Sequence, residues 1–153
     1  MGYVLELRQT VGSRPLIQVG SMAIPINEQG QVLMIYRADL EVWSFPAGSM
    51  ELGDNLEQTA RRELREEAGV DAQLFELLYV DSGAHTYFKY PNGHEAYNVT
   101  AVYLARGITG MLRADGEETL DVRWFDLDAP PDHSRGVKEV LPLLLERRSR
   151  GEL

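Results

Sequence analysis

Three glutamates near the middle of the chain have a spacing that suits metal binding. Glu63, Glu66 and Glu67 lie at i, i+3 and i+4, and side chains so spaced are neighbours on the surface of an α-helix. Two such charges about 4 Å apart repel by about 1 kcal/mol in water and about 4 kcal/mol at an effective dielectric constant of 20. A hard divalent cation removes this repulsion, because Mg²⁺ and Ca²⁺ take oxygen ligands. The spacing therefore predicts a divalent-metal site, with a solvated acidic helix face as the alternative.

The apolar side of the same helix favours the metal site over the solvated face. At about 100° per residue, the apolar stripe of this helix is formed by Leu56, Ala60, Leu64 and Ala68. Glu67 falls inside that stripe and Glu63 at its edge, where a merely solvated glutamate would not be placed. Arg61 and Arg65 point away from the carboxylates.

The segment before the helix is predicted to be a backbone-rich loop. Residues 46–54 contain one proline and two glycines, residues that interrupt helices and strands. Asn55 with Gln58 resembles a capping box, so the helix should begin near Asn55. It should end at Gly69, which suits the left-handed position after a helix. Folded against the helix start, such a loop can offer N–H and carbonyl groups to a metal–phosphate complex.

Loop and helix together resemble the Nudix box of the Nudix hydrolases. That pattern is Gly, five residues, then Glu, seven residues, then Arg-Glu-aliphatic-x-Glu-Glu-x-Gly-aliphatic. In this chain it runs from Gly48 to Val70. Asp54 stands where the pattern has Glu, and Ala47 stands where the family usually has a second Gly. Because the fixed positions are spread over 23 residues, the match is highly specific.

The resemblance implies a fold, an activity and a cofactor. The expected fold is α/β (α+β), a Nudix-like α/β/α sandwich with a mixed β-sheet. The expected activity is metal-dependent hydrolysis of a pyrophosphate linkage in a nucleoside diphosphate joined to another moiety, with Mg²⁺ or Mn²⁺. A nucleotide-binding or regulatory Nudix domain without turnover is the alternative. A third alternative, an acidic interaction module without metal, requires the match to be accidental.

The box also implies roles for single residues. Glu63, Glu66 and Glu67 are the expected metal ligands, joined by the backbone carbonyl of Ala47. Arg62 precedes Glu66 by four residues and can orient it as an i,i+4 pair; the alternative is a surface ion pair worth a few tenths of a kcal/mol.

Two further glutamates are candidates for the general base. Relatives use either a glutamate of the box or a carboxylate on a loop towards the C-terminus. Glu117 and Glu118 lie on such a loop, just before a predicted strand. A solvated turn is the alternative for both, and in that case the base falls back to Glu63.

Recognition of the substrate is less specified by the sequence. Gly48 and Glu51 of the box loop are candidate substrate-binding residues. Trp43 and Tyr97 lie near the box and in the second predicted hairpin, and either ring could stack on a base. Core packing or cross-strand pairing is the alternative for both rings.

Strands and helices must position these residues. Strands are expected at residues 16–26, 32–36, 72–80, 85–90, 95–104 and 120–125, and a second helix at 137–148. The first two strands are expected to form a hairpin across residues 27–31. A second hairpin is expected around Pro91-Asn92-Gly93, the clearest turn in the chain.

Composition limits the class of protein. The 153 residues suit a single domain spanning 1–153, and 44% aliphatic and aromatic residues exclude a disordered chain. There is no apolar run of about 18 residues that could span a membrane. The absence of cysteine excludes disulfides and thiolate metal sites, and a cytoplasmic location is expected.

Charge limits the partners. The formal net charge is −9, which argues against a basic face for nucleic acid; neither nucleic acid nor a membrane is an expected partner. An anionic nucleotide is compatible with this acidity only through a bound cation. A nucleotide-type small molecule is therefore the expected partner, and a homodimer stays open.

Overall fold

The computed structural model describes residues 2–153. The helices in this part of the chain are α1 (Tyr3–Val11), α2 (Leu56–Ala68) and α3 (Arg135–Ser149), with a short 3₁₀ turn, η1 (Ala84–Thr86). The strands are β1 (Leu16–Pro25), β2 (Val32–Arg37), β3 (Val42–Ser44), β4 (Ala47–Ser49), β5 (Val70–Asp81), β6 (Tyr87–Lys89), β7 (Glu95–Gly110) and β8 (Thr119–Phe125). No described helix is both long and apolar enough to cross a bilayer.

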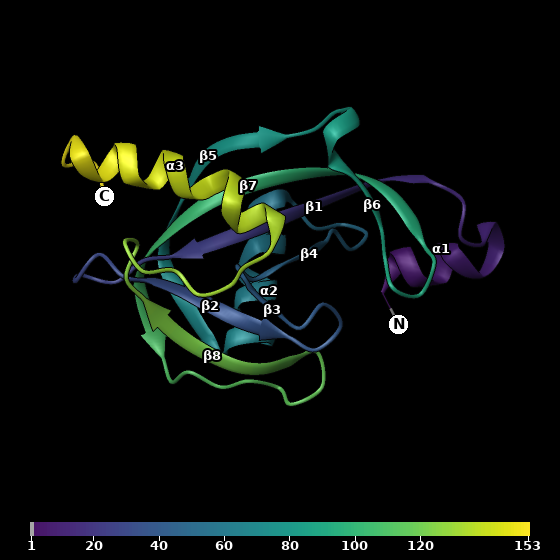
Figure 1. Ribbon diagram of the computed structural model, residues 1–153. Coiled ribbons are helices and arrows are strands. Elements are labelled where there is room, and N and C mark those ends of the chain that lie inside the picture. Colours follow the sequence, from purple (N-terminus) through teal and green to yellow (C-terminus); the bar gives the residue numbers. More distant parts are fainter. Residues whose placement is uncertain (1) are drawn as a thin grey trace.

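The strands form two sheets (Figure 1). One has the order β4-β1-β7-β5, with β6 paired to β7; the other has the order β3-β2-β8. β1 and β7 run parallel, and β5 and β6 are antiparallel to β7. The first sheet is therefore mixed, as the resemblance implies.

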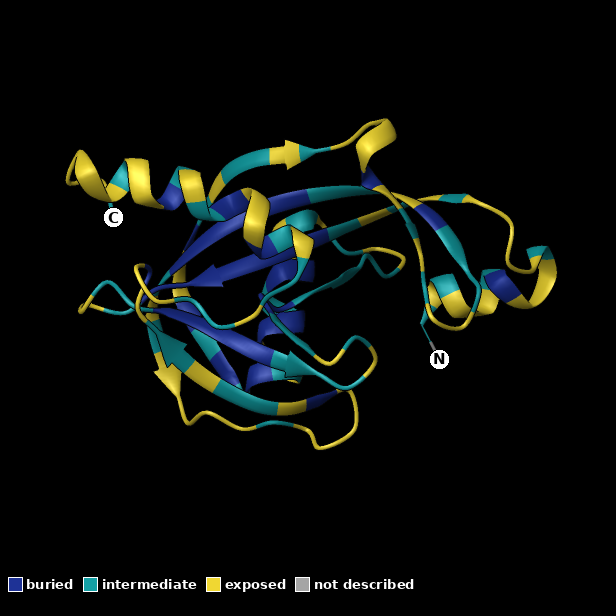
Figure 2. Cartoon of the chain, in the orientation of Figure 1, coloured by how far each residue is buried: buried dark blue, intermediate teal, exposed yellow. Residues whose placement is uncertain are grey.

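Alternate residues of the central strands pack on opposite helices. Buried residues on one face form a core with α3: Met22, Ile24, Met34, Val102, Leu104, Val137, Val140 and Leu144. Those on the other face form a core with α2: Ala23, Leu33, Ile35, Ala101, Tyr103, Ala60, Leu64 and Ala68. Both faces of these strands are thus covered, which explains their continuous apolar runs. Figure 2 shows the buried residues along the central strands and on the inner side of α2. The predicted α/β/α sandwich is confirmed.

The predicted hairpin between the first two strands is wrong. β1 and β2 lie in different sheets, and one bridge, Ile26↔Val32, joins their ends. The connection is tight, because Asn27 Oδ1 accepts hydrogen bonds from the backbone of Gln29 and Gln31 at 3.1 and 2.9 Å. Apolar runs buried on both faces carry no alternation that would show which neighbour they pair with.

The second predicted hairpin is confirmed. β6 pairs with β7, and Tyr90 N donates to His94 O at 2.8 Å across the turn. Gly93 has φ 87°, a conformation that glycine adopts without strain. The C-terminal helix is also confirmed, beginning at Arg135 rather than residue 137.

The predicted ends of α2 are confirmed. Asn55 Oδ1 accepts from Gln58 N, and Gln58 Oε1 accepts from Asn55 N, both at 2.8 Å. Gly69 is left-handed, with φ 75° and ψ 7°. The preceding segment is less irregular than its composition predicts, because Ala47–Ser49 forms β4 and pairs with β1.

Candidate active site

The three box glutamates project from one side of α2 into different environments. Glu63 is buried, with 8% of its surface exposed, whereas the Glu66 side chain is 59% exposed. Glu67 lies between these extremes. Glu63 and Glu67 both lie on the apolar side of α2, as predicted, but Glu63, which was expected at the edge of the apolar stripe, is the more buried of the two. Arg61 and Arg65 point away, as predicted, and both pair with Asp71 at the start of β5.

Glu67 is a partly buried carboxylate whose negative charge is poorly compensated by its neighbours. Burial raises its pKa well above the ordinary value of 4.5, and the nearby charges of Glu63 and Glu118 raise it further. The backbone N–H of Ala47, 3.0 Å from Glu67 Oε2, and the charge of Arg37 offset only part of this rise. A positive charge placed beside Glu67 would therefore be strongly attracted.

Arg62 is the cation paired with Glu63 and Glu66. Its Nη1 lies 2.7 Å from Glu63 Oε1 and 3.5 Å from Glu66 Oε2. Its Nη2 donates to Ser49 O at 2.8 Å, and Asp54 Oδ2 lies 3.4 Å from its Nε. Arg62 therefore joins the box loop to the helix. Its main acidic partner is Glu63, whereas the sequence predicted Glu66.

The pKa of Glu63 is also raised. Burial is the main cause, and the charges of Glu66 and Glu118 act in the same direction. The adjacent Arg62 guanidinium offsets only part of the rise. Two of the three expected ligands thus carry charge that the surrounding protein does not fully stabilise.

The donor set fits a hard cation. It consists of carboxylate oxygens from three neighbouring helical positions beside a backbone-rich strand, the oxygen ligands that Mg²⁺ and Mn²⁺ take. As the side chains stand in residues 2–153, no three acidic or histidine groups converge closely enough to hold an ion. In this arrangement Arg62 supplies the counter-charge to Glu63 and Glu66.

Gly48 allows the loop to approach the helix. A Cβ at this position would lie 2.2 Å from Glu63 Oε1 and 2.3 Å from its Cδ. The carbonyl of Gly48 in turn lies where a Cβ on Gly20 would be, 2.2 Å away. Two glycines thus bring β1, β4 and the Glu63 carboxylate into direct contact.

We expect Gly48→Ala to lower kcat more than tenfold while the chain still folds. The new methyl group must push the Glu63 carboxylate aside, and a displacement of about 1 Å can lower activity by about a hundredfold. Because the end of a side chain moves rather than the backbone, the loss of unfolding free energy should be near the low end for overpacking, about 1 kcal/mol. Turnover assays and urea titration measure both, with Ser49→Ala as the control. An unchanged kcat in Gly48→Ala would contradict this role for Gly48.

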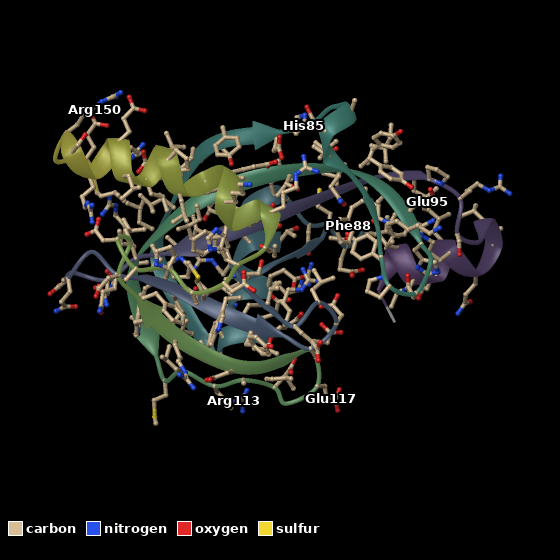
Figure 3. The ribbon with its side chains drawn as sticks, in the orientation of Figure 1. His85, Phe88, Glu95, Arg113, Glu117 and Arg150 are labelled. Carbon is tan, nitrogen blue, oxygen red and sulfur yellow. The ribbon has the colours of Figure 1, made fainter. Side chains whose placement is uncertain are left out.

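The loop before β8 distinguishes its two glutamates. Asp115 Oδ1 accepts from the backbone N–H groups of Glu117, Glu118 and Thr119 at 2.8 to 3.0 Å, which fixes the turn. The charge of Glu118 raises the pKa of both Glu63 and Glu67. Both glutamates are exposed, but Glu117 is not among the charges that raise these pKa values, and Figure 3 shows it at the outer edge of the molecule. Of the two, Glu118 is therefore the stronger candidate for a role beside the box.

A cleft adjoins the carboxylates. A cavity of about 250 Å³ is lined by β1, Ala47, Gly48 and Ser49. It continues into a second cavity of about 420 Å³ beneath α3 and the β6–β7 hairpin, since both are lined by Arg37, Tyr90, Asn98 and Thr100. Ligand pockets typically measure about 300–1,000 Å³, so the second cavity has room for a nucleoside.

The predicted substrate-binding residues are not all at this cleft. Gly48 lines the smaller cavity. Trp43 does not line either cavity; its ring packs edge-on against Tyr36 and Phe125, at centroid distances of 5.4 and 4.8 Å. Tyr97 packs against Tyr87 on the hairpin. The rings of Trp43 and Tyr97 therefore pack against other aromatic side chains, the alternative to stacking on a base.

The Glu51 carboxylate accepts a hydrogen bond from the protein backbone. Its Oε2 accepts from Tyr3 N at 2.9 Å, so this loop residue contacts α1. Sequence reasoning did not anticipate α1, although Val4, Leu7 and Val11 have helical apolar spacing.

Arg37 and Asn98 were missed by sequence reasoning. Both line the two cavities. Arg37 is held side-on by Asp39 at 2.9 and 2.7 Å. On β7, Asn98 and Thr100 continue the face that Val102 and Leu104 bury further along. Polar residues on an otherwise apolar strand face are a signal that could have found this wall.

Comparison with known proteins agrees with the geometry. The family model described as the NUDIX domain matches residues 16–144. The 8-oxo-dGDP phosphatase NUDT18 of Mus musculus is 32% identical over 129 residues, covering 80% of this chain and 36% of the mouse protein. The ADP-ribose pyrophosphatase of Methanocaldococcus jannaschii is 28% identical over 123 residues, covering 76% of this chain and 69% of that protein.

A solved structure gives the same result. The crystal structure of the MutT NUDIX hydrolase from Burkholderia pseudomallei matches with a TM-score of 0.69 and 26% identity, covering 83% of this chain and 97% of that one. The chain spans only about a third of the length of the mouse relative. With a family match over most of its residues and the box carboxylates gathered on α2, this chain belongs to the Nudix family.

Proposed function

We propose that this chain hydrolyses a pyrophosphate linkage in a nucleoside diphosphate joined to a further moiety, with Mg²⁺ or Mn²⁺ held by Glu63, Glu66 and Glu67. One observation carries the proposal. Ala47 and Gly48, which contact the carboxylates of Glu67 and Glu63, line a cleft that leads into a cavity of about 420 Å³, and both carboxylates have raised pKa values. A nucleoside in that cavity would direct its phosphates towards the box. The 8-oxo-dGDP phosphatase of the mouse and the ADP-ribose pyrophosphatase of Methanocaldococcus both act, by name, on a nucleotide that contains a pyrophosphate linkage.

The chain's own groups would bind the substrate at both ends. Arg37 lies where the two cavities meet, and Asp39 holds its Nε and Nη2, so Nη1 remains for a phosphate oxygen. The Asn98 amide carries donors and acceptors for a base or sugar. Phe88 and Tyr90 form an aromatic wall of the larger cavity, with ring centroids 4.9 Å apart. Figure 3 shows Phe88 on the inner side of the hairpin.

The chemical step would use Glu118 as the general base. The charge of Glu118 raises the pKa of Glu63 and Glu67. Glu118 would accept the proton that the attacking water loses. When bound, the divalent cation neutralises charge on the phosphate oxygens and lowers the pKa of bound water. Ala47 would add its carbonyl to the ligand set, and Arg62 would stay beside the carboxylates as a positioning residue.

A substrate panel tests the proposal. 8-oxo-dGDP, dGTP and ADP-ribose are incubated with the protein in Mg²⁺, in Mn²⁺ and in chelator, and the products are identified by phosphorus-31 NMR. We expect metal-dependent release of a nucleoside monophosphate from at least one of them. Glu57→Gln, an exposed glutamate of the same helix, is the control and should keep full activity.

The other outcomes separate the alternatives. Nucleotide binding without product in either metal would overturn turnover and support the regulatory alternative. No binding and no product with any of the three nucleotides would contradict the proposed substrate class.

A further inference from the structure

Helix α1 lies apart from the two cores, yet it contacts both sides of the substrate cleft. Figure 1 shows it beside the β6–β7 hairpin, at the far end of the molecule from the C-terminus. At its start, Tyr3 N donates to Glu51 Oε2 at 2.9 Å. Gly2 is so close that a Cβ there would lie 2.6 Å from Glu51 Oε1. The first turn of α1 is therefore attached to the box loop.

The other end of α1 is attached to the hairpin. Arg8 Nη1 donates to Gly12 O at 3.1 Å and Arg14 O at 2.5 Å, and Arg8 Nη2 donates to Glu95 O at 2.6 Å. The backbone N–H of Glu95 donates to Ser13 O at 3.2 Å. Glu95 is the first residue of β7, and Figure 3 shows it beside α1.

The environment of Arg8 indicates that this attachment fixes geometry. Arg8 is only 5% exposed, and its guanidinium donates to the backbone carbonyls of Gly12, Arg14 and Glu95. A buried charge without an ionic partner is destabilising. A guanidinium does, however, present several donors in a fixed planar arrangement. Arg8 can thus hold the end of α1, the following loop and the hairpin in one relative position.

Both attachment points lie in segments whose neighbouring residues line the cleft. Glu51 lies two residues after Ser49, whose carbonyl holds Arg62, and close to Gly48, which touches Glu63. Glu95 pairs with Lys89 next to the turn of the hairpin whose Phe88 and Tyr90 line the larger cavity. The box-loop wall contacts the carboxylates of α2, and the hairpin wall carries the aromatic rings.

We propose that α1 is a strap that sets the spacing between the Nudix box loop and the β6–β7 hairpin, with Glu51 and Arg8 as positioning residues for substrate binding. Its effect on affinity rests on the proposed function, because it requires that the cleft bind a nucleotide. If either end of α1 is released, the spacing between the box loop and the hairpin is no longer fixed. The substrate then loses contacts with one of these segments while it stays bound to the other. KM should rise more than kcat falls.

Tyr3→Pro breaks one attachment alone. Tyr3 is the first residue of α1, a position where proline is favoured and where its missing N–H disturbs no helical hydrogen bond. Gly2 has φ −72° and ψ 156°, the extended conformation preferred before proline. The substitution therefore keeps the helix and removes only the donor to Glu51. Tyr3→Ala is the matched control, since it keeps the N–H and removes the ring.

We expect Tyr3→Pro to raise KM about fivefold, as for the loss of one partly exposed hydrogen bond to a charged group, with kcat within about twofold. Tyr3→Ala should match the parent. KM is measured with 8-oxo-dGDP or ADP-ribose, whichever the panel selects. Arg8→Gln should raise KM more, with Arg14→Gln, an exposed arginine of the same segment, as its control. If Arg8→Gln fails to fold, the comparison of Tyr3→Pro with Tyr3→Ala still tests the proposal.

Hydrogen exchange of the protein in Mg²⁺ alone tests the strap without turnover. Residues 47–54 should exchange faster in Tyr3→Pro than in Tyr3→Ala, and residues 87–95 faster in Arg8→Gln than in Arg14→Gln. The amides of α3 should be unchanged in all four. Equal exchange and equal KM in Tyr3→Pro and Tyr3→Ala would overturn the strap. A parent that turns over no nucleotide but shows these differences would overturn the proposed function and keep the strap.

Discussion

Glu67→Gln is expected to lower kcat/KM more than about a hundredfold while raising the stability of the metal-free protein. Changing a residue that only supports a metal ligand typically lowers metal affinity or activity 10- to 100-fold, and loss of a ligand should exceed that. The gain in stability has a separate cause. Burial raises the pKa of Glu67, so its ionised form destabilises the native state, and glutamine keeps the shape without the charge.

The destabilisation caused by Glu67 should depend on pH in a definite direction. A carboxyl whose pKa is raised in the folded protein destabilises it above that raised pKa, and the effect disappears as the pH falls to the ordinary value of 4.5. The metal-free parent should therefore gain stability relative to Glu67→Gln as the pH is lowered from 7 towards 5. Urea midpoints at several pH values measure this. A metal-free Glu67→Gln less stable than the parent at pH 7 would contradict the account of Glu67.

Glu66→Gln should lose activity without that gain in stability. Its side chain is 59% exposed, so water already solvates the charge. The contrast separates the two ligands: both substitutions remove a carboxylate, but only Glu67→Gln relieves a buried charge. Glu57→Gln serves again as the exposed control on α2.

Glu118→Gln is expected to lower kcat about 10²- to 10⁴-fold, the usual contribution of a general base, with little change in KM. A base acts in the transition state, so its loss should leave substrate affinity intact. Glu117→Gln is the matched control, because Glu117 is an exposed glutamate of the same turn and is not among the charges that raise the pKa of the box carboxylates.

Other results would give Glu118 and its loop a different role. A Glu118→Gln enzyme that regains activity at high metal concentration would make Glu118 a metal ligand rather than the base. Two variants that both behave like the parent would leave the loop as a solvated turn and return the role of base to Glu63.

The sequence predicted the parts of the fold that depend on local chemistry. The capping box at Asn55, the left-handed Gly69 and the turn at Gly93 are each fixed by a few adjacent residues. The apolar stripe of α2 correctly placed Glu63 and Glu67 towards the core. The partner of β1 could not be predicted, because a strand buried on both faces carries no alternation to distinguish its neighbours.

The same holds for the site, where local features could be predicted and contacts between distant residues could not. The ligand helix could be read from spacing, whereas the second wall of the cleft is formed by residues far apart in the chain, Arg37 on β2 and Asn98 on β7. The neighbours of Trp43 depend on sheet pairing, so its ring could not be assigned to the cavity or the core in advance. Only the folded chain shows Glu51 bonded to α1.

Binding of Mn²⁺ to the parent and to Glu67→Gln, followed by the electron paramagnetic resonance signal of the free ion, tests the central claim that α2 holds a divalent cation. We predict that the parent removes Mn²⁺ from solution and that Mg²⁺ competes for the same site. Glu67→Gln should bind at least tenfold more weakly, and Glu57→Gln should bind like the parent. Equal binding by the parent and Glu67→Gln, or no binding by the parent even with nucleotide present, would contradict a metal site on this helix.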